Sequence, residues 1–281
     1  MRSMKILITG ANGQLAKTVA YYNKVHDLIL ATKSVINIED RRDVYQKITM
    51  YKPDIVYHFA SMTRGDECAA NPKKAYKVNV TGTRHIARIT AKLGIPIVFV
   101  STNEVFDGTK QTPYTESDIP NPKTVVGKNK YKAEQIIITT NPQHYIVRTM
   151  WLYSEWSNNF IQAIVKKSRN NASINLVSDE IGSPTNTSDL AQAIMLLSAT
   201  GKYGVYHITN TGSASRLDFG REVFNKLKIN ITIRPVLLND FKRASKPPKY
   251  SVLESKKISK MGILMRNWQS ALNDFLTHNT I

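Results

Sequence analysis

Near its N-terminus the chain carries Thr9-Gly10-Ala11-Asn12-Gly13-Gln14-Leu15-Ala16, directly after the apolar run Ile6-Leu7-Ile8. An apolar strand, a glycine-rich turn and a helix in this order are typical of a dinucleotide-binding site. Gly10 and Gly13 let the backbone turn tightly and approach a pyrophosphate, whose charge is met by the N–H groups of the helix that follows. Ala16 stands where the pattern accepts Gly or Ala for close packing of helix on strand. The alternative is an ordinary strand-to-helix turn.

The first half of the chain alternates short apolar runs with helical patterns. The runs are almost continuously hydrophobic, as expected for parallel strands whose two faces are both covered by helices. This rhythm predicts an α/β fold with a Rossmann-like, doubly wound parallel sheet. The predicted strands are Lys5–Thr9, Asp27–Ala31, Asp54–Phe59, Ile97–Ser101 and Tyr145–Arg148.

From about Trp151 the rhythm loosens, which indicates a smaller C-terminal substrate-binding lobe. We predict an NAD(P)-binding domain at residues 1–150, which also receives later segments, and a lobe at residues 151–281, with a cleft at the carboxyl ends of the strands. The lobe also contains a basic, proline-containing loop. The expected segments are a helix at Asn159–Lys167, a strand at Ile174–Val177, a helix after Thr187-Ser188, a strand at Val205–Thr209, a helix after Ser215, the loop Arg243–Tyr250 and a helix at Trp268–Leu276.

The composition and charge of the chain favour some classes of binding partner over others. The chain has 281 residues, 42% of them hydrophobic, and a formal charge of +18 that favours anionic partners. Its basic residues are dispersed and no nucleic-acid-binding motif accompanies them, so nucleotide-linked substrates and a phosphorylated cofactor are preferred over nucleic acid. We see no signal peptide and no apolar run of about 18 residues, so we expect a cytoplasmic protein without a membrane span. Cys68 is the single cysteine, which excludes an internal disulfide, and we expect no metal site.

The end of the second predicted strand indicates which cofactor binds. NAD-binding proteins of this pattern place an acidic residue there, which binds the ribose 2′-hydroxyl. The chain has Thr32-Lys33-Ser34 instead, followed shortly by Arg41-Arg42. Since a lysine cannot accept from a hydroxyl but neutralises a 2′-phosphate, we predict NADPH. NADH remains the alternative if Lys33 is a solvated surface lysine.

A series of short motifs extends along most of the chain and carries a family resemblance. They are Gly10-Ala-Asn-Gly-Gln-Leu15, Lys52-Pro-Asp-Ile-Val56, Ala60-Ser-Met-Thr63, Ala75-Tyr-Lys-Val-Asn79, Ser101-Thr102, Val105-Phe-Asp-Gly108, Val147-Arg-Thr-Met-Trp-Leu-Tyr153, Asn158-Asn-Phe160, Gly182-Ser-Pro-Thr185 and Pro248-Lys-Tyr-Ser-Val-Leu253. In order and spacing the chain resembles the dTDP-4-dehydrorhamnose reductases, which are extended short-chain dehydrogenases. The resemblance implies reduction of the C4 ketone of a nucleotide-linked 6-deoxy-hexose by a hydride from NAD(P)H, in dTDP-rhamnose synthesis.

The catalytic motif departs from this family. Such reductases place a tyrosine four residues before a lysine, so that both side chains share a helix face. The lysine binds the nicotinamide ribose and the tyrosine protonates the ketone oxygen. Here Lys130 is present, but Val126 occupies the tyrosine position and has no proton to give. Tyr131 points about 100° away on a helix and is a poor substitute.

A second departure follows the fourth strand, where the chain has Ser101-Thr102-Asn103-Glu104 and the family usually carries an aspartate and a tyrosine after the Ser-Thr pair. Thr102 can hydrogen-bond a substrate carbonyl. Glu104 is the candidate replacement acid, because a carboxyl buried beside a ligand has a raised pKa. The alternative is an exposed or ion-paired loop glutamate. The candidate catalytic residues are therefore Lys130, Thr102 and Glu104.

The glycine turn, Lys33 and the resemblance together imply one set of cofactor-binding residues and one set of substrate-binding residues. A homodimer is a further expectation. The alternative to a substrate-binding role is a place in the core for Trp151 and a solvated surface position for Lys246 and Lys249. His58, where the family usually has asparagine, is expected to pack near the cofactor without a catalytic role. The cofactor set is Gly10, Asn12, Gly13, Gln14, Leu15, Lys33, Asn37, Ile38, Phe59, Ala60, Ser61, Thr63, Asn79, Ser101, Lys130 and Arg148. The substrate set is Asn103, Trp151, Asn159, Glu180, Arg243, Lys246 and Lys249, the last three charges lying in a loop that resembles the family's diphosphate-facing segment.

Three function classes remain open. The first is an NADPH-dependent reductase of a nucleotide-activated 4-dehydro-6-deoxy sugar, slowed or altered by the missing tyrosine. The second, which Val126 favours, is a non-catalytic relative that binds a dinucleotide or a nucleotide sugar in a regulatory or assembly role. Nucleic-acid binding is the third.

Overall fold

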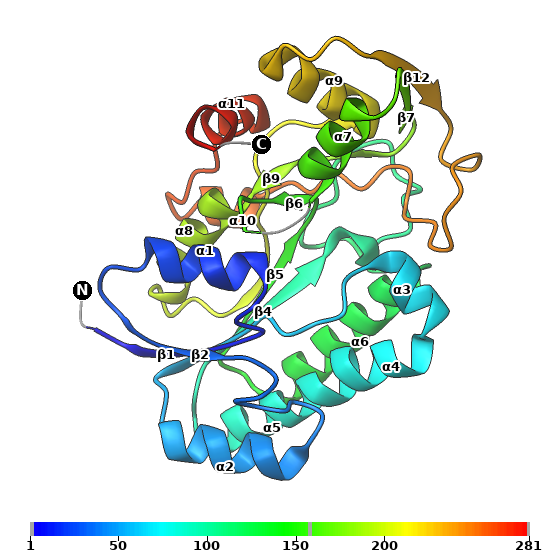
Figure 1. Cartoon of the computed structure of the whole chain (residues 1–281). Coiled ribbons are helices and arrows are strands. Elements are labelled where there is room, and N and C mark those ends of the chain that lie inside the picture. The colour runs from blue at the N-terminus through cyan, green and yellow to red at the C-terminus, as the bar shows by residue number, and fades with distance from the viewer. Residues whose placement is uncertain (1–2, 157–158, 280–281) are drawn as a thin grey trace.

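The computed structural model describes residues 3–156 and 159–279 of the chain. Its centre is a parallel six-stranded sheet with the strand order β10-β5-β4-β3-β1-β2 (Figure 1). The strands are β1 (Lys5–Thr9), β2 (Asp27–Ala31), β3 (Ile55–His58), β4 (Ile97–Thr102), β5 (His144–Thr149) and β10 (Gly204–His207). The predicted doubly wound α/β fold is confirmed.

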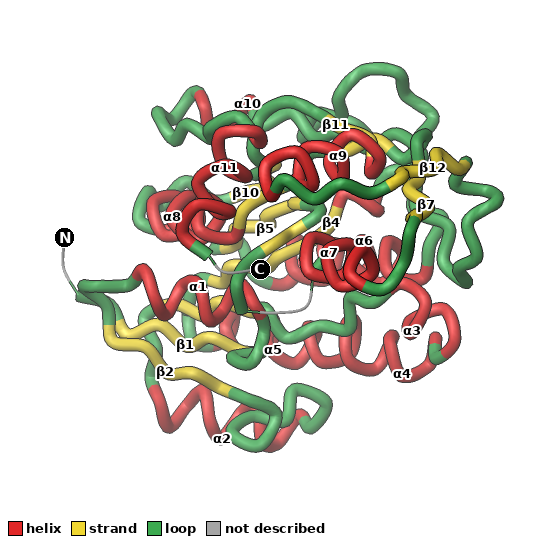
Figure 2. The backbone as a smooth tube through the Cα atoms, turned by 45° about the horizontal axis from the view of Figure 1, so that its top comes forward, coloured by secondary structure: helices red, strands yellow, loops and turns green. Residues whose placement is uncertain are grey.

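Helices cover both faces of this sheet because successive side chains of each strand point to opposite sides. Ile6 and Ile8 of β1 belong to a core shared with two helices, while Leu7 between them belongs to the core on the other face. The first face carries α1 (Gln14–Tyr22) and α8 (Thr187–Ser198). The other face carries α2 (Arg41–Tyr51), α5 (Thr83–Lys92) and α6 (Val125–Thr140), as the two ribbon views also show (Figures 1 and 2).

Segments beyond residue 150 complete this layer. The predicted strand at 205–209 is β10, which pairs with β5 at the sheet edge, and α8 packs beside α1. β10 and α8 therefore pack with the sheet layer, although they lie beyond residue 150 in the chain. The boundary at residue 150 itself stays a proposal.

The second lobe has its own core, built mainly from aromatic and aliphatic side chains such as Phe219 and Trp268. β7 and β12 pair in parallel within it, and β12 is a strand that the sequence analysis did not predict. Its elements are β6 (Leu152–Tyr153), α7 (Phe160–Arg169), β7 (Ser173–Val177), β8 (Ile181–Gly182), β9 (Thr185–Asn186), β11 (Ala214–Ser215), α9 (Arg216–Leu227), β12 (Thr232–Val236) and α11 (Trp268–His278). The short α10 (Lys256–Ser259) packs on β10 instead, with Ile258 in the core of the central sheet.

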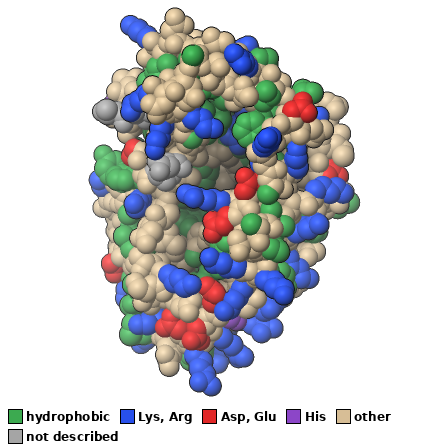
Figure 3. All heavy atoms as spheres, turned by 45° about the vertical axis from the view of Figure 1, so that its right-hand side comes forward, with side chains coloured by type: hydrophobic (Ala, Val, Ile, Leu, Met, Phe, Trp, Pro, Cys, Tyr) green, Lys and Arg blue, Asp and Glu red, His purple; other side chains and the backbone are tan. Residues whose placement is uncertain are grey.

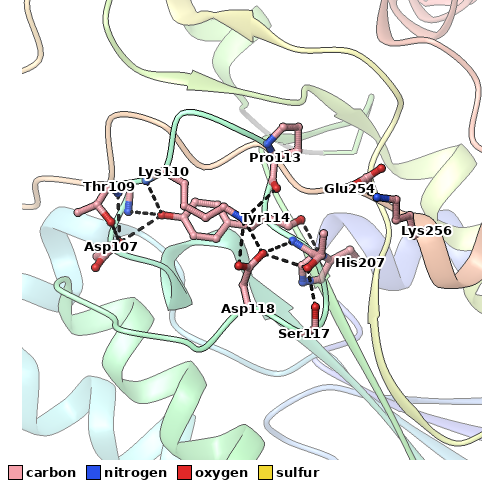
Figure 4. Close-up of polar contacts among 12 residues, drawn as sticks. Asp107, Thr109, Lys110, Pro113, Tyr114, Ser117, Asp118, His207, Glu254 and Lys256 are labelled. Atoms are coloured by element: carbon pink, nitrogen blue, oxygen red, sulfur yellow. Dashed lines mark hydrogen bonds and ion pairs between the residues drawn. The ribbon is translucent and has the colours of Figure 1, made fainter.

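Short helical segments follow β3 and β4, and one ordered loop follows the second of these strands. The segments are α3 (Gly65–Ala70), α4 (Pro72–Tyr76), the π-helix η1 (Lys77–Gly82) and the 3₁₀ turn η2 (Asn103–Val105). The loop after η2 is held by its own polar contacts, including Lys110 with Asp118 at 2.8 Å and the Tyr114 hydroxyl donating to Asp107 at 3.2 Å (Figure 4). Tyr114 also exchanges backbone hydrogen bonds with residues 252 and 254, so the loop fixes the C-terminal segment beside the strand ends.

In the part of the chain that the structure describes, no helix combines the length and the apolar character needed to cross a bilayer.

Candidate active site

A cleft of about 660 Å³ lies at the carboxyl ends of the strands. Figure 3 shows this face hollowed between the upper and lower parts of the molecule, with Lys and Arg side chains around the hollow. From the predicted sets, the lining includes Gly13, Gln14, Leu15, Phe59, Ser61, Thr63, Ser101, Thr102, Asn103, Glu104, Lys130, Trp151, Glu180 and Arg243, and Val126 lines it as well. The tertiary fold therefore brings together residues from both ends of the sequence.

The glycine turn forms one end of the cleft. Gly10 has φ +73°, and a Cβ there would stand 2.6 Å from the backbone nitrogen of Ala60, so only glycine fits. Gly13 is the N-cap of α1, and no side chain caps that helix. Its first N–H groups are thus directed at the cleft, and a Cβ on Gly13 would stand 3.1 Å from Gly10 O in space that a close-lying pyrophosphate needs. The residues present fit a dinucleotide.

The loop after β3 forms the neighbouring wall. Phe59, Ser61 and Thr63 line the cleft. Asn79, from η1, lies behind them and holds the loop, since its side chain accepts from Met62 N at 2.8 Å and from Ser61 Oγ at 3.0 Å. Asn79 therefore positions the wall, where the resemblance implied direct contact.

The end of β2 lies beside the glycine turn, because Ala11 N donates to Ala31 O at 3.3 Å. Lys33 follows it with a side chain 77% exposed and pairs with Glu39 at 3.0 Å. This pair lowers the pKa of Glu39. Asn37 and Ile38 follow in the same loop, and Ile38 packs against Gly82. Lys33 thus lies in the loop after the strand that ends beside the glycine turn, outside the cleft lining, with an acidic neighbour that the prediction did not include.

Val126 and Lys130 lie one turn apart on α6, and both line the cleft as the spacing predicted. Lys130 is 5% exposed, and its ammonium donates to Val100 O at 2.8 Å. Burial lowers the pKa of Lys130 to about 8, while Glu134 opposes that shift. Val126 packs with Cys68 and Ala75, so the wall in front of Lys130 is apolar where the family has a phenol.

Glu104 is held in the cleft by the start of α6. Thr124, the N-cap of α6, accepts from Gly127 N at 2.9 Å and donates to Glu104 Oε2 at 2.5 Å. Since the hydroxyl proton goes to Oε2, Oε1 is the oxygen left to carry a proton. Burial raises the pKa of Glu104, with smaller opposing effects of Thr124 and nearby arginines. Gly127 makes this packing fit, because a Cβ there would collide with Glu104 O.

Hydroxyl and amide groups surround the same centre. Thr102 Oγ1 donates to Asn103 Oδ1 at 3.1 Å, and Asn103 Nδ2 donates to Ser251 Oγ at 2.7 Å. The buried hydroxyls of Ser101 and Thr149 have no hydrogen-bond partner among the described residues. Unpaired buried hydroxyls are costly, which is consistent with a polar ligand at this position.

The far end of the cleft is charged and aromatic. Trp151 has the strained φ of +48°, and the guanidinium of Arg216 lies 3.6 Å above its ring. Glu180, 2% exposed, pairs with Arg216 at 3.3 Å and with Arg243 at 2.6 Å. Trp151 thus contacts the cleft and is not purely a core residue.

The other predicted residues do not line the cleft: Gly10, Asn12, Lys33, Asn37, Ile38, Ala60 and Asn79 belong to the turns and loops around it, and Arg148, Asn159, Lys246 and Lys249 make contacts elsewhere. Arg148 is buried and donates two hydrogen bonds to Glu134, at 3.0 and 2.7 Å, so its guanidinium links β5 to α6 inside the protein. Asn159 caps α7 and accepts from Ile161 N at 2.9 Å. Lys246 donates to Asn239 O at 2.8 Å and Lys249 pairs with Asp179 at 2.7 Å, so both charges are used locally. Asn158 of the resemblance lies outside the described residues.

Among the residues described, neither His58 nor Tyr131 lines the cleft, and both pack against other side chains of the protein. His58 lies 2.7 Å from Thr9 Oγ1 and 2.9 Å from Thr83 Oγ1. Burial lowers its pKa to about 3, so its ring is neutral. Tyr131 packs on a hydrophobic cluster that contains Met150, away from the position that a proton donor needs.

Arg216 is the main site residue that the sequence analysis missed. The only signal was a basic residue at the first position of a helix that starts with a capping box at Ser215 and Asp218. Within residues 3–156 and 159–279, no group of three His, Cys, Asp or Glu side chains is arranged to hold a metal ion.

Comparison with known proteins agrees with this geometry. The family model described as RmlD substrate binding domain matches residues 4–281. The spore coat polysaccharide biosynthesis protein SpsK of Bacillus subtilis is 35% identical, over 97% of this chain and 96% of that protein. A dTDP-4-dehydrorhamnose reductase of Aggregatibacter actinomycetemcomitans is 32% identical, over 96% and 97%. The structure of a Bacillus anthracis dTDP-4-dehydrorhamnose reductase in complex with NADP superposes with a TM-score of 0.96 at 32% identity, covering 99% of this chain and 100% of that one. The chain therefore belongs to the RmlD substrate binding domain family, whose relatives here include dTDP-4-dehydrorhamnose reductases.

Proposed function

We propose that the chain is an NADPH-dependent reductase of the C4 ketone of a nucleotide-activated 4-dehydro-6-deoxy sugar, with Glu104 as its proton donor. The observation that carries this proposal is that one cleft contains the glycine turn, Lys130 with Thr102, and the Trp151 end. The relatives' names and the NADP complex of the Bacillus anthracis protein support the reaction and the cofactor. Lys33 supports NADPH over NADH.

NADPH, when bound, supplies the hydride for C4 of the sugar. The N–H groups at the start of α1 would hold its pyrophosphate, and Lys130 would hold the nicotinamide ribose and stabilise negative charge on the ketone oxygen. Thr102 orients that oxygen. Glu104 gives it a proton, and Thr124 stabilises the carboxylate that remains, since it already donates to Oε2.

The direct test is an assay of dTDP-4-dehydrorhamnose reduction with NADPH and with NADH. The rate is measured from the oxidation of the nicotinamide cofactor, and the alcohol product is detected separately. Turnover with a preference for NADPH is the expected result. We further propose a cytoplasmic location and a homodimer, which cell fractionation and sedimentation analysis test.

The second candidate function is a non-catalytic relative that binds the same ligands, and the observation that favours it is the apolar Val126 wall. Tight binding of NADPH and of a nucleotide sugar without any ketone reduction is the outcome that selects this candidate.

A further inference from the structure

Four charged side chains converge at the far end of the cleft: Glu104, Glu180, Arg216 and Arg243. Glu180 Oε2 lies 2.6 Å from Arg243 Nη2, and Glu180 Oε1 lies 3.3 Å from Arg216 Nε. One carboxylate thus faces two guanidinium groups, so these three groups carry one net positive charge, which stays uncompensated when Glu104 is protonated. An anion is the ligand that matches this end of the cleft in that state.

Both arginines are arranged to receive such an anion. The Arg216 guanidinium is fixed against two aromatic rings, 3.6 Å from the centre of Trp151 and 5.2 Å from that of Phe160. The buried Nε of Arg243 has no hydrogen-bond partner among the described residues. A planar guanidinium that is already ordered loses little conformational freedom when it binds a phosphate. A sugar nucleotide carries its diphosphate as such an anion.

Glu104 belongs to the same electrostatic group. Burial raises its pKa, Glu180 adds to that shift, and Arg243 and Arg216 oppose it. From the other elements around it, Thr124 of the α6 cap donates to it, and Cys68 of α3 interacts with both Glu104 and Lys130. Asp66 of α3 lines the cleft as a further acidic group. The hydrogen bond from Thr124 and the two arginines thus favour the ionised carboxylate, and of these the arginines are the groups whose charge an anionic ligand can neutralise.

We propose that an anionic group of the substrate, seated on Arg216 and Arg243, loads Glu104 with the proton that this residue then gives to the ketone oxygen. The inference rests on the proposed function. Because the diphosphate neutralises the two guanidinium groups, the carboxylic acid form of Glu104 gains in stability once substrate is bound. In the reaction, C4 gains the hydride and the oxygen gains the proton of Glu104, which is left as a carboxylate. Glu104 then takes its next proton from water when the next substrate binds. Glu104 therefore takes up its proton when the substrate binds.

The experiment is isothermal titration calorimetry of the full chain with dTDP-glucose, in buffers of different ionisation enthalpy over about pH 5 to 8. This probe carries the diphosphate, has no ketone, and its phosphate groups do not titrate in that range. We expect uptake of at most about one proton per site, since a single carboxyl is loaded. Glu104→Gln keeps the hydrogen bond from Thr124 and should bind dTDP-glucose without this uptake. Glu222→Gln, at a surface pair with Lys226 on α9, is the matched control and should keep it.

Arg243→Gln should weaken dTDP-glucose binding and reduce the uptake together. Binding without proton uptake, uptake that is undiminished in Glu104→Gln, or failure of dTDP-glucose to bind would each overturn the inference. The reductase assay separates these results from a failure of the proposed function. Turnover without Glu104-dependent uptake removes the inference alone, whereas loss of both NADPH binding and turnover removes the function.

Discussion

At the residue scale, position 126 tests whether a phenol can replace Glu104 as proton donor. Val126 is 3% exposed and borders the cleft, so a longer side chain can extend from it towards the substrate. In a chain that carries Glu104→Gln, adding Val126→Tyr should place a phenol one turn from Lys130 and raise kcat for ketone reduction by about 10²-fold or more. Adding Val126→Phe fills the same space without a hydroxyl and should leave the rate of the Glu104→Gln chain unchanged. Equal rates for the tyrosine and phenylalanine double variants would contradict the account that position 126 is where a donor is missing.

Lys33 is the residue that we propose selects the cofactor. Its exposed ammonium, 3.0 Å from Glu39, is available to a 2′-phosphate. Lys33→Asp should cost NADPH binding about 1.5 to 3 kcal/mol, the range for hydrogen bonds to charged groups, and shift the preference towards NADH. Fluorescence titration with both cofactors measures the ratio. Lys202→Asp, at an exposed site, is the charge-matched control. An affinity ratio that Lys33→Asp leaves unchanged would remove Lys33 from the site.

At the scale of elements, the turn between β1 and α1 is the site that we propose binds the dinucleotide. Gly13→Val should abolish NADPH binding, since the side chain would fill the pyrophosphate space, while the fold is largely kept. Thermal unfolding and NADPH titration on the same sample separate the two effects. Gly10→Ala is the contrasting variant, because at φ +73° and 2.6 Å from Ala60 N it should unfold the protein first. Normal binding by Gly13→Val would show that the turn does not hold the cofactor.

The contact between η2 and α6 positions Glu104. Gly127→Ala would drive a Cβ into Glu104 O and separate the two elements. Overpacking of this kind typically costs about 1 to 3 kcal/mol of stability. Denaturant unfolding measures the loss, and the loss should be accompanied by slower reduction because Thr124 and Glu104 move apart. Wild-type stability and wild-type rate together would contradict this positioning role.

The elements that sequence predicted well are those whose signal is local. β1 and β2 match their apolar runs residue for residue, and the four-residue spacing of Val126 and Lys130 placed both on one helix face. β12 was missed because Thr232–Val236 is short, partly exposed and contains a proline. Arg216 was missed because its role depends on where α9 meets Trp151, which no local pattern encodes. Lys246 and Lys249 were assigned by charge alone, and nearby acceptors engage both.

At the scale of the whole molecule, two buried histidines couple stability to pH. Burial lowers the pKa of both His58 and His207 to about 3. Since the unfolded chain protonates them near pH 6.5, their neutral form stabilises the fold above that pH, and the stability is lost as pH falls towards 3. Each histidine should contribute a slope of about 1.4 kcal/mol per pH unit between roughly pH 6 and 4.5. Urea unfolding across that range should show a slope that His58→Asn halves. A flat profile would show that neither ring is held neutral.

The account as a whole depends on Glu104 as proton donor. The most direct test compares the wild type with Glu104→Gln in steady-state reduction of dTDP-4-dehydrorhamnose with NADPH. The expected result is turnover by the wild type and a kcat lower by about 10²- to 10⁴-fold in the variant, with NADPH affinity unchanged. Equal turnover by the two proteins would contradict the account, because the proton would then come from elsewhere.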